Sequence, residues 1–209
     1  MAVNFSQSRT KENLMRAFAG ESQARNRYTI AAEEAENKGF YALKEIFLFT
    51  AEQERAHAAR FYEFLKQEAG NTIEIDGTYP VDQSESLVEL LNMAAHNERQ
   101  EHEDVYPAFA KTAEEEGFQD VAYTFREIAE VEKVHGVRFT KLADMLKNET
   151  YYEKPEGDEW MCLNCGYIFK GTKLPTMCPV CHKERGYFIP ACMAPYLGFE
   201  GSGYERKGE

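Results

Sequence analysis

Apolar residues recur at helical spacing along much of the chain. Steps of three and four residues place side chains on one face of a helix, and such steps predict helices over residues 9–38, 40–69, 87–116 and 119–146. Gly39 and Gly117 lie at the short breaks within two pairs of these helices, and glycine commonly follows the end of a helix. Each pair should therefore pack as an antiparallel hairpin.

The connection between the two hairpins is long and rich in turn residues. It covers residues 70–84 and contains Gly77 and Pro80, and either Ser84 or Ser86 is suited to cap the third helix. Two hairpins joined by one long crossover have the connectivity of ferritin-like bundles. The predicted fold class is therefore mainly α, a ferritin-like four-helix bundle followed by a small C-terminal module.

Each predicted helix brings at least one carboxylate onto its apolar face. The second and fourth helices each carry a Glu-x-x-His pair there, and the inward set consists of Glu21, Glu54, His57, Glu98, Glu101, Glu132 and His135. A carboxylate buried alone either becomes protonated or finds a cation. Two Glu-x-x-His pairs with further glutamates from the other two helices are the ligand set of di-iron and di-manganese bundles.

The charge of this set agrees with a pair of metal ions. Its five glutamates carry −5, close to the charge of two divalent ions or of two trivalent ions with an oxo bridge.

Glu101 is additional to the usual set, and its helical phase favours the core over a surface ion pair. His96 and His102 lie off the stripe and receive no role. Tyr28 and Tyr106 are candidates to donate hydrogen bonds to ligand carboxylates, with an ordinary core position as the alternative.

Four of the five cysteines form two Cys-x-x-Cys pairs near the C-terminus, Cys162 with Cys165 and Cys178 with Cys181. Four thiolates at this spacing form a tetrahedral metal site, and zinc ribbons share the spacing. Gly166 and Tyr167 after the first pair, Pro179 within the second and the aromatic residues nearby resemble rubredoxin, which favours iron. The fifth cysteine, Cys192, is expected to be a free thiol.

Charge and hydropathy exclude several classes of partner. The formal net charge of −12 argues against nucleic acid and anionic membrane surfaces, which require a basic face. The longest apolar runs are far shorter than the roughly 20 residues that span a bilayer, and the polar N-terminus lacks the apolar region of a secretory signal. A cytoplasmic location is expected.

The order of these motifs resembles that of the rubrerythrin family, over residues 5–190. The resemblance implies a ferritin-like domain over residues 1–149, a linker over 150–158, a rubredoxin-like domain over 159–190 and a C-terminal extension over 191–209 to which we assign no role. It also implies two iron ions in the bundle, bridged by carboxylates and, when oxidised, by an oxo group, and one iron ion on the four cysteines.

The same resemblance implies a peroxidase that reduces hydrogen peroxide to water and protects against oxidative stress. Electrons would come from an NAD(P)H-linked reductase or a separate rubredoxin and pass through the rubredoxin-like iron, within a homodimer or larger oligomer. One bundle iron would shift between His57 when reduced and Glu101 when oxidised. Two alternatives remain open: a ferroxidase that handles iron, and a non-enzymatic protein with a zinc-filled ribbon.

Overall fold

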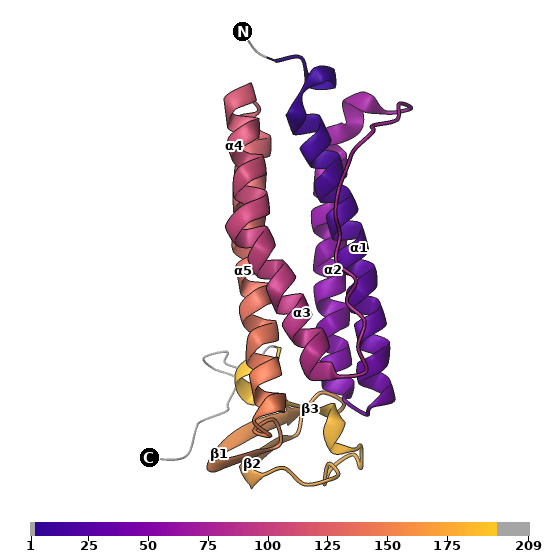
Figure 1. Cartoon of the computed structure of the whole chain (residues 1–209). Coiled ribbons are helices and arrows are strands. Elements are labelled where there is room, and N and C mark those ends of the chain that lie inside the picture. Colours follow the sequence, from indigo (N-terminus) through magenta and orange to yellow (C-terminus); the bar gives the residue numbers. More distant parts are fainter. Residues whose placement is uncertain (1–2, 196–209) are drawn as a thin grey trace.

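The computed structural model describes residues 3–195 and shows a long helical bundle with a small sheet at one end (Figure 1). Two helices form one hairpin, and the other hairpin has one arm divided by a π turn, Glu101–Val105. The helices are α1 (Arg9–Asn37), α2 (Tyr41–Phe64), α3 (Leu87–Gln100), α4 (Tyr106–Glu116) and α5 (Gln119–Lys147). Short 3-10 turns cover Phe5–Gln7 and Leu65–Glu68. The predicted ferritin-like bundle is confirmed.

Local sequence signals set the helix ends. The Ser8 hydroxyl accepts a hydrogen bond from the Lys11 backbone N–H at 3.0 Å and starts α1. Ser86, not Ser84, caps α3, since its hydroxyl accepts from the Glu89 N–H. Gly39 and Gly117 have φ of 74° and 91°, a left-handed conformation that glycine adopts without a steric penalty.

Residues 71–86, the strap, connect the hairpins without helix or strand and run along the bundle (Figure 1). Arg16 of α1 donates to Asp76 Oδ1 at 2.7 Å, and the Tyr79 hydroxyl donates to the Arg16 carbonyl oxygen at 3.2 Å. Asp82 accepts from Arg27 at 3.1 Å and from Asn97 at 2.7 Å. These contacts hold the strap against α1 and α3.

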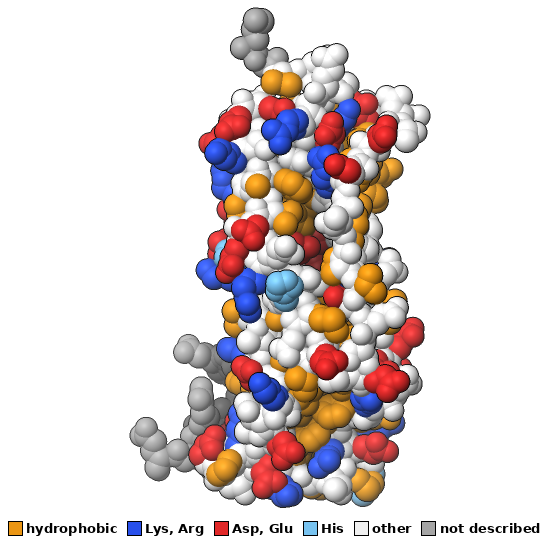
Figure 2. Space-filling model, viewed as in Figure 1, with side chains coloured by type: hydrophobic (Ala, Val, Ile, Leu, Met, Phe, Trp, Pro, Cys, Tyr) orange, Lys and Arg blue, Asp and Glu red, His pale blue; other side chains and the backbone are white. Residues whose placement is uncertain are grey.

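The apolar core of the helical bundle is divided into two clusters. Phe47 and Phe139 stack at 5.5 Å in the cluster nearer the sheet, and the rings of Phe61 and Phe125 lie 5.0 Å apart in the other. Along α2 and α5, the Glu-x-x-His pairs lie between these aromatic positions. The outer surface carries charges of both signs, with hydrophobic side chains gathered along the seam between the hairpins (Figure 2). The buried charged layer is therefore enclosed by aromatic rings above and below.

The C-terminal module is built on a three-stranded antiparallel sheet in the order β2-β1-β3. Its strands are β1 (Glu153–Cys162), β2 (Ile168–Lys173) and β3 (Phe188–Pro190). The expectation of a linker over residues 150–158 is wrong for most of that segment, because β1 begins at Glu153, which pairs with Lys173. A register shift between Glu153 and Asp158, with Gly157 at φ 83°, explains why this polar stretch reads as a loop.

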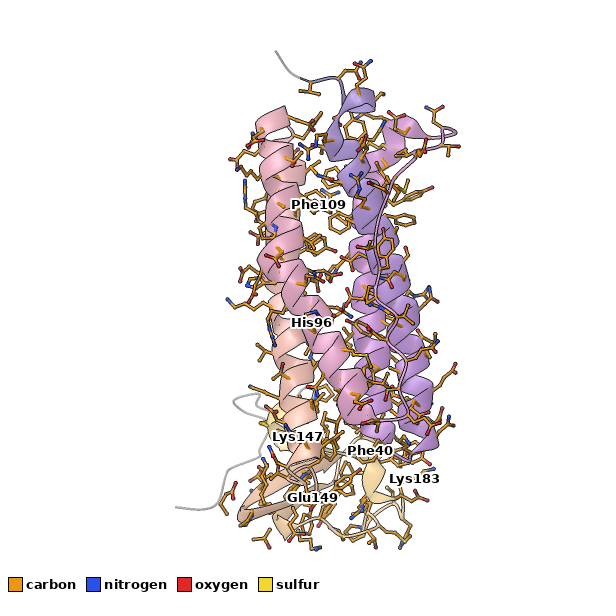
Figure 3. All side chains as sticks on the ribbon, in the orientation of Figure 1. Phe40, His96, Phe109, Lys147, Glu149 and Lys183 are labelled. Carbon is orange, nitrogen blue, oxygen red and sulfur yellow. The ribbon has the colours of Figure 1, made fainter. Side chains whose placement is uncertain are left out.

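The module packs against the end of the bundle where α1 turns into α2. Gly186 lies so close to Gly39 that a Cβ atom on Gly186 would be 1.6 Å from the Gly39 carbonyl oxygen. The rings of Tyr41 and Tyr187 stack at 4.3 Å across the same junction. Phe40, Lys147 and Lys183 mark this end of the molecule in Figure 3.

Among the residues that the structure describes, none of the helices combines the length and the apolar character needed to cross a bilayer.

Candidate metal centres

The inward carboxylates and imidazoles meet in the middle of the bundle. They come from α1, α2, α3 and α5, and the side chains of Glu21, Glu54, Glu98 and Glu132 are no more than 1% exposed. His135 is equally buried, whereas the His57 side chain is 13% exposed. The structure thus brings together six of the seven predicted bundle ligands.

Two groups of potential ligands share two carboxylates. One group is Glu21, Glu54, His57 and Glu132, and the other is Glu54, Glu98, Glu132 and His135, with the ligand atoms of each group within 4.8 Å of one another. His57 Nδ1 lies 2.9 Å from Glu132 Oε1 and 3.3 Å from Glu54 Oε2. His135 Nδ1 lies 2.8 Å from Glu132 Oε2 and 3.1 Å from Glu54 Oε1. Each shared carboxylate therefore points one oxygen at each histidine, as a bridge between two ions requires.

Most of the cluster's inward-facing atoms have no hydrogen-bond partner among the described residues. Eight of its buried oxygen and nitrogen atoms lack a hydrogen bond to any described residue, although buried polar atoms are nearly always paired in native proteins. Burial and the charges of Glu132 and Glu54 raise the pKa of Glu21 well above its usual value. Burial lowers the pKa of His57, but the adjacent carboxylates outweigh it and raise that pKa to about 9. A pair of cations would satisfy both the lone pairs and the charge.

Two tyrosines orient the outer carboxylates. The Tyr28 hydroxyl donates to Glu98 Oε1, and the Tyr106 hydroxyl donates to Glu21 Oε1. Both tyrosines are buried, so these hydrogen bonds exclude water and fix the carboxylate that each one contacts. The sequence left open whether Tyr28 and Tyr106 donate hydrogen bonds to ligand carboxylates or are ordinary core residues. In the structure, both tyrosines donate such hydrogen bonds.

Gln53 is a residue that the sequence analysis missed. His135 Nε2 lies 3.0 Å from Gln53 Oε1, and Arg138 donates to Thr50 at 3.1 Å beside it. Because the Gln53 oxygen can only accept, the proton of His135 lies on Nε2 and the Nδ1 lone pair remains free for a metal ion. In the sequence, Gln53 is only a polar neighbour of Glu54 and looks like any surface residue.

Glu101 lies beside the ligand groups without joining either. It begins the π turn, and its charge is close enough to contribute to the raised pKa of Glu21, after burial, Glu132 and Glu54. His102 anchors the same turn through a contact of 2.9 Å between Nδ1 and the Ala129 carbonyl oxygen of α5. His96 lies exposed on α3 (Figure 3) and belongs to neither ligand group.

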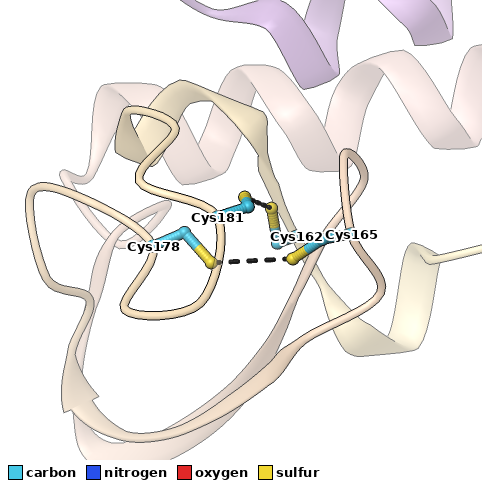
Figure 4. Close-up of side chains that lie close together, drawn as sticks. All are labelled: Cys162, Cys165, Cys178 and Cys181. Atoms are coloured by element: carbon cyan, nitrogen blue, oxygen red, sulfur yellow. Dashed lines mark hydrogen bonds between the residues drawn. The ribbon is translucent and has the colours of Figure 1, made fainter.

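The four paired cysteines form a second cluster in the C-terminal module (Figure 4). Cys162 and Cys181 have their sulfur atoms 3.7 Å apart, as do Cys165 and Cys178, and all four thiols are free of disulfide bonds. A backbone hydrogen bond from Lys183 lowers the pKa of Cys181 to about 6, which favours the thiolate that binds metal.

The remaining cysteine takes no part in this cluster. Cys192 is exposed in a short 3-10 turn, Ala191–Met193. The rest of the predicted C-terminal extension, from residue 196 onward, lies outside the described residues.

Comparisons with known proteins agree with both clusters. Residues 12–143 match the family model of rubrerythrin, and residues 160–189 match the model of the rubrerythrin rubredoxin-like domain. Rubrerythrin-1 of Clostridium acetobutylicum is 46% identical over 183 residues, 87% of this chain and 93% of the relative. Rubrerythrin of Porphyromonas gingivalis is 44% identical and covers 88% of this chain and 90% of its own.

Solved structures agree with the fold as well. Fully reduced, all-ferrous nigerythrin superposes with a TM-score of 0.59 at 29% identity, covering 90% of this chain and 94% of its own. With the two clusters, these matches confirm the predicted cofactors, two iron ions in the bundle and one in the four-cysteine module.

Proposed function

Because the chain belongs to the rubrerythrin family, we propose that it is a peroxidase that reduces hydrogen peroxide to water. The observation that carries this proposal is the pair of metal groups sharing Glu54 and Glu132, in a chain that also carries four clustered cysteines. The reaction consumes two electrons and two protons for each O–O bond cleaved. Two metal ions held side by side match a two-electron acceptor, and the single-iron site matches a supply of electrons one at a time.

The residues of the bundle hold and orient the reacting centre. One ion would be held by Glu21, Glu54, His57 and Glu132, and the other by Glu54, Glu98, Glu132 and His135. When bound, a ferrous pair supplies the two electrons that cleave the peroxide. Tyr28 and Tyr106 keep Glu98 and Glu21 in place through their hydrogen bonds.

Glu101 has the role of an exchangeable ligand in this proposal, replacing His57 at one ion when the site is oxidised. Two features support it. Glu101 lies next to the ligand groups on a π turn, a conformation found frequently at functional sites. Among the described residues no hydrogen bond holds the second ring nitrogen of His57, so this ring is freer to leave than that of His135.

The four clustered cysteines would hold an iron ion that supplies electrons to the bundle. We propose an NAD(P)H-linked reductase or a separate rubredoxin as the donor, a homodimer as the working unit and a cytoplasmic protective role. No basic surface for nucleic acid is expected at a net charge of −12.

Stopped-flow spectroscopy of the fully reduced, anaerobic protein tests the activity. We expect about one equivalent of hydrogen peroxide to oxidise the bundle irons faster than dioxygen does, followed by return of the red ferric-thiolate colour. The Glu101→Ala variant should bind iron normally and lose peroxide turnover. A faster reaction with dioxygen would instead indicate a ferroxidase, and a colourless four-cysteine site would indicate a zinc ribbon.

A further inference from the structure

A cavity of about 280 Å³ lies between α1, the strap and the π turn, next to the carboxylate cluster. Its buried end is formed by Glu101, Tyr106 and Arg27, and its exposed end by Ala108 of α4 and Thr78 of the strap. Tyr106 also donates its hydroxyl hydrogen bond to Glu21. The cavity therefore extends from solvent to the residues that surround one of the two metal groups.

Hydrogen bonds hold the walls of the cavity in place. The strap forms one side with Tyr79 and Pro80, and it is tied to α1 at Arg16 and Arg27. The same Arg27 contributes a guanidinium whose side chain is 11% exposed. The space is thus a preformed site whose shape the strap maintains.

The lining has two chemical characters. At the buried end Arg27 offers a positively charged guanidinium and Glu101 offers a carboxylate. The rest of the lining includes the apolar side chains of Ala17, Val105 and Phe109. Such a site matches a ligand with a polar oxygen head and a short apolar body.

The volume exceeds the needs of hydrogen peroxide. A water molecule takes up about 30 Å³ in the liquid, and hydrogen peroxide has only one further oxygen atom. A cavity of about 280 Å³ therefore has room for several carbon atoms beside the O–O group.

We propose that this cavity is a binding site for small alkyl hydroperoxides, which makes them a second substrate class of the bundle. The inference rests on the proposed peroxidase function. The hydroperoxide group meets Arg27 and Glu101, and the alkyl group lies against Ala17, Val105 and Phe109. When bound, the metal pair would supply the two electrons that cleave the O–O bond; with two protons, the alkyl-bearing oxygen would leave as an alcohol and the other as water.

Ala108→Trp tests the site without touching a metal ligand. Ala108 is exposed at the mouth of the cavity, so the larger ring narrows the entrance while leaving the core unchanged. With tert-butyl hydroperoxide we expect the second-order rate constant to fall at least about tenfold, and with hydrogen peroxide to stay within about twofold. Ala59→Trp, at an exposed position of α2, is the matched control and should leave both rates unchanged.

Binding is measured separately on zinc-loaded protein, which is redox-silent. Addition of tert-butyl alcohol should shift the methyl NMR signals of Ala17 and Val105 in the wild type and not in Ala108→Trp. Equal effects of Ala108→Trp on both peroxides, or no effect on either, would overturn the proposal and leave the cavity as a water-filled space. If hydrogen peroxide is not reduced either, the proposed function fails. The NMR experiment on the zinc-loaded protein then tests the binding site alone: shifted methyl signals support alkyl binding, and unshifted signals refute it.

Discussion

The two histidines of the carboxylate cluster have different surroundings at the level of single residues. His135 is buried and contacts Gln53 through the ring nitrogen that faces away from the cluster. His57 is partly exposed and has no such contact among the described residues. A histidine whose second nitrogen is held keeps its ring orientation when the metal charge changes, whereas one without that contact can turn away. The asymmetry explains why His57, and not His135, is the ligand proposed to exchange.

Replacing Gln53 with alanine should weaken one metal position and spare the other. Loss of such an outer hydrogen bond typically costs about 10- to 100-fold in metal affinity, so Co²⁺ titration of Gln53→Ala should show one site weakened to that extent. Gln53→Glu retains an acceptor oxygen and should restore most of the affinity. Gln67→Ala, at an exposed position in the 3-10 turn after α2, is the control. Two sites of unchanged affinity in Gln53→Ala would show that this contact does not orient His135.

The sequence identifies ligands more readily than their partners. Glu54 and Glu132 can be recognised because a charged side chain on the apolar face of a helix is costly to bury unless a cation or another partner compensates its charge. Gln53 and Arg27 cannot, since each acts through a contact with a residue more than fifty positions away. Such contacts depend on how the helices and the strap pack, which the spacing along one helix does not reveal.

Among the elements, the π turn shows where helical periodicity stops being informative. From Glu98 and Glu101, the next step of four residues along a regular helix reaches Val105, yet the buried positions after the turn are Tyr106, Ala110 and Ala113. The stripe has moved by one residue because a π turn adds a residue to the helical ladder. This shift turns Tyr106 inward to Glu21, and the apolar pattern alone does not distinguish it from a continuous helix.

The junction between the C-terminal module and the bundle depends on the absence of a side chain at Gly186. Gly186→Ala would place a Cβ atom 1.6 Å from the Gly39 carbonyl oxygen, and backbone atoms cannot yield as a side chain would. We expect the module to keep its four-cysteine iron and its colour but to separate from the bundle, which limited trypsin digestion would detect as faster cleavage after Lys147. The same change at Gly20, where the nearest atom is 3.8 Å away on Tyr79, should leave digestion unchanged. Digestion of Gly186→Ala at the wild-type rate would show that the junction adapts.

Over the whole molecule, the two metal clusters lie far apart within one chain. The module contacts the bundle near Tyr41, and Glu54 is thirteen residues further along α2. At 1.5 Å per residue this separation is about 20 Å before the distance within the module is added. Because electron tunnelling slows steeply with distance, we propose that electrons pass between chains, in a homodimer that would place the module of one chain beside the bundle of the other.

A mixed dimer tests that route. One chain carries Cys165→Ser, which removes a thiolate from the single-iron site, and the other carries Glu132→Ala, which removes a carboxylate shared by both bundle groups. Each variant alone should lack reductase-driven peroxide turnover. The two chains are co-expressed with different tags and purified as a heterodimer. Of the two routes between chains, only the one from the intact four-cysteine site of the Glu132→Ala chain to the intact bundle of the Cys165→Ser chain remains. We therefore expect about half of the wild-type rate per dimer. If electrons stay within a chain, the heterodimer is as inactive as its parents, because neither chain has both sites intact; an isolated monomer with full activity would exclude the interchain route directly.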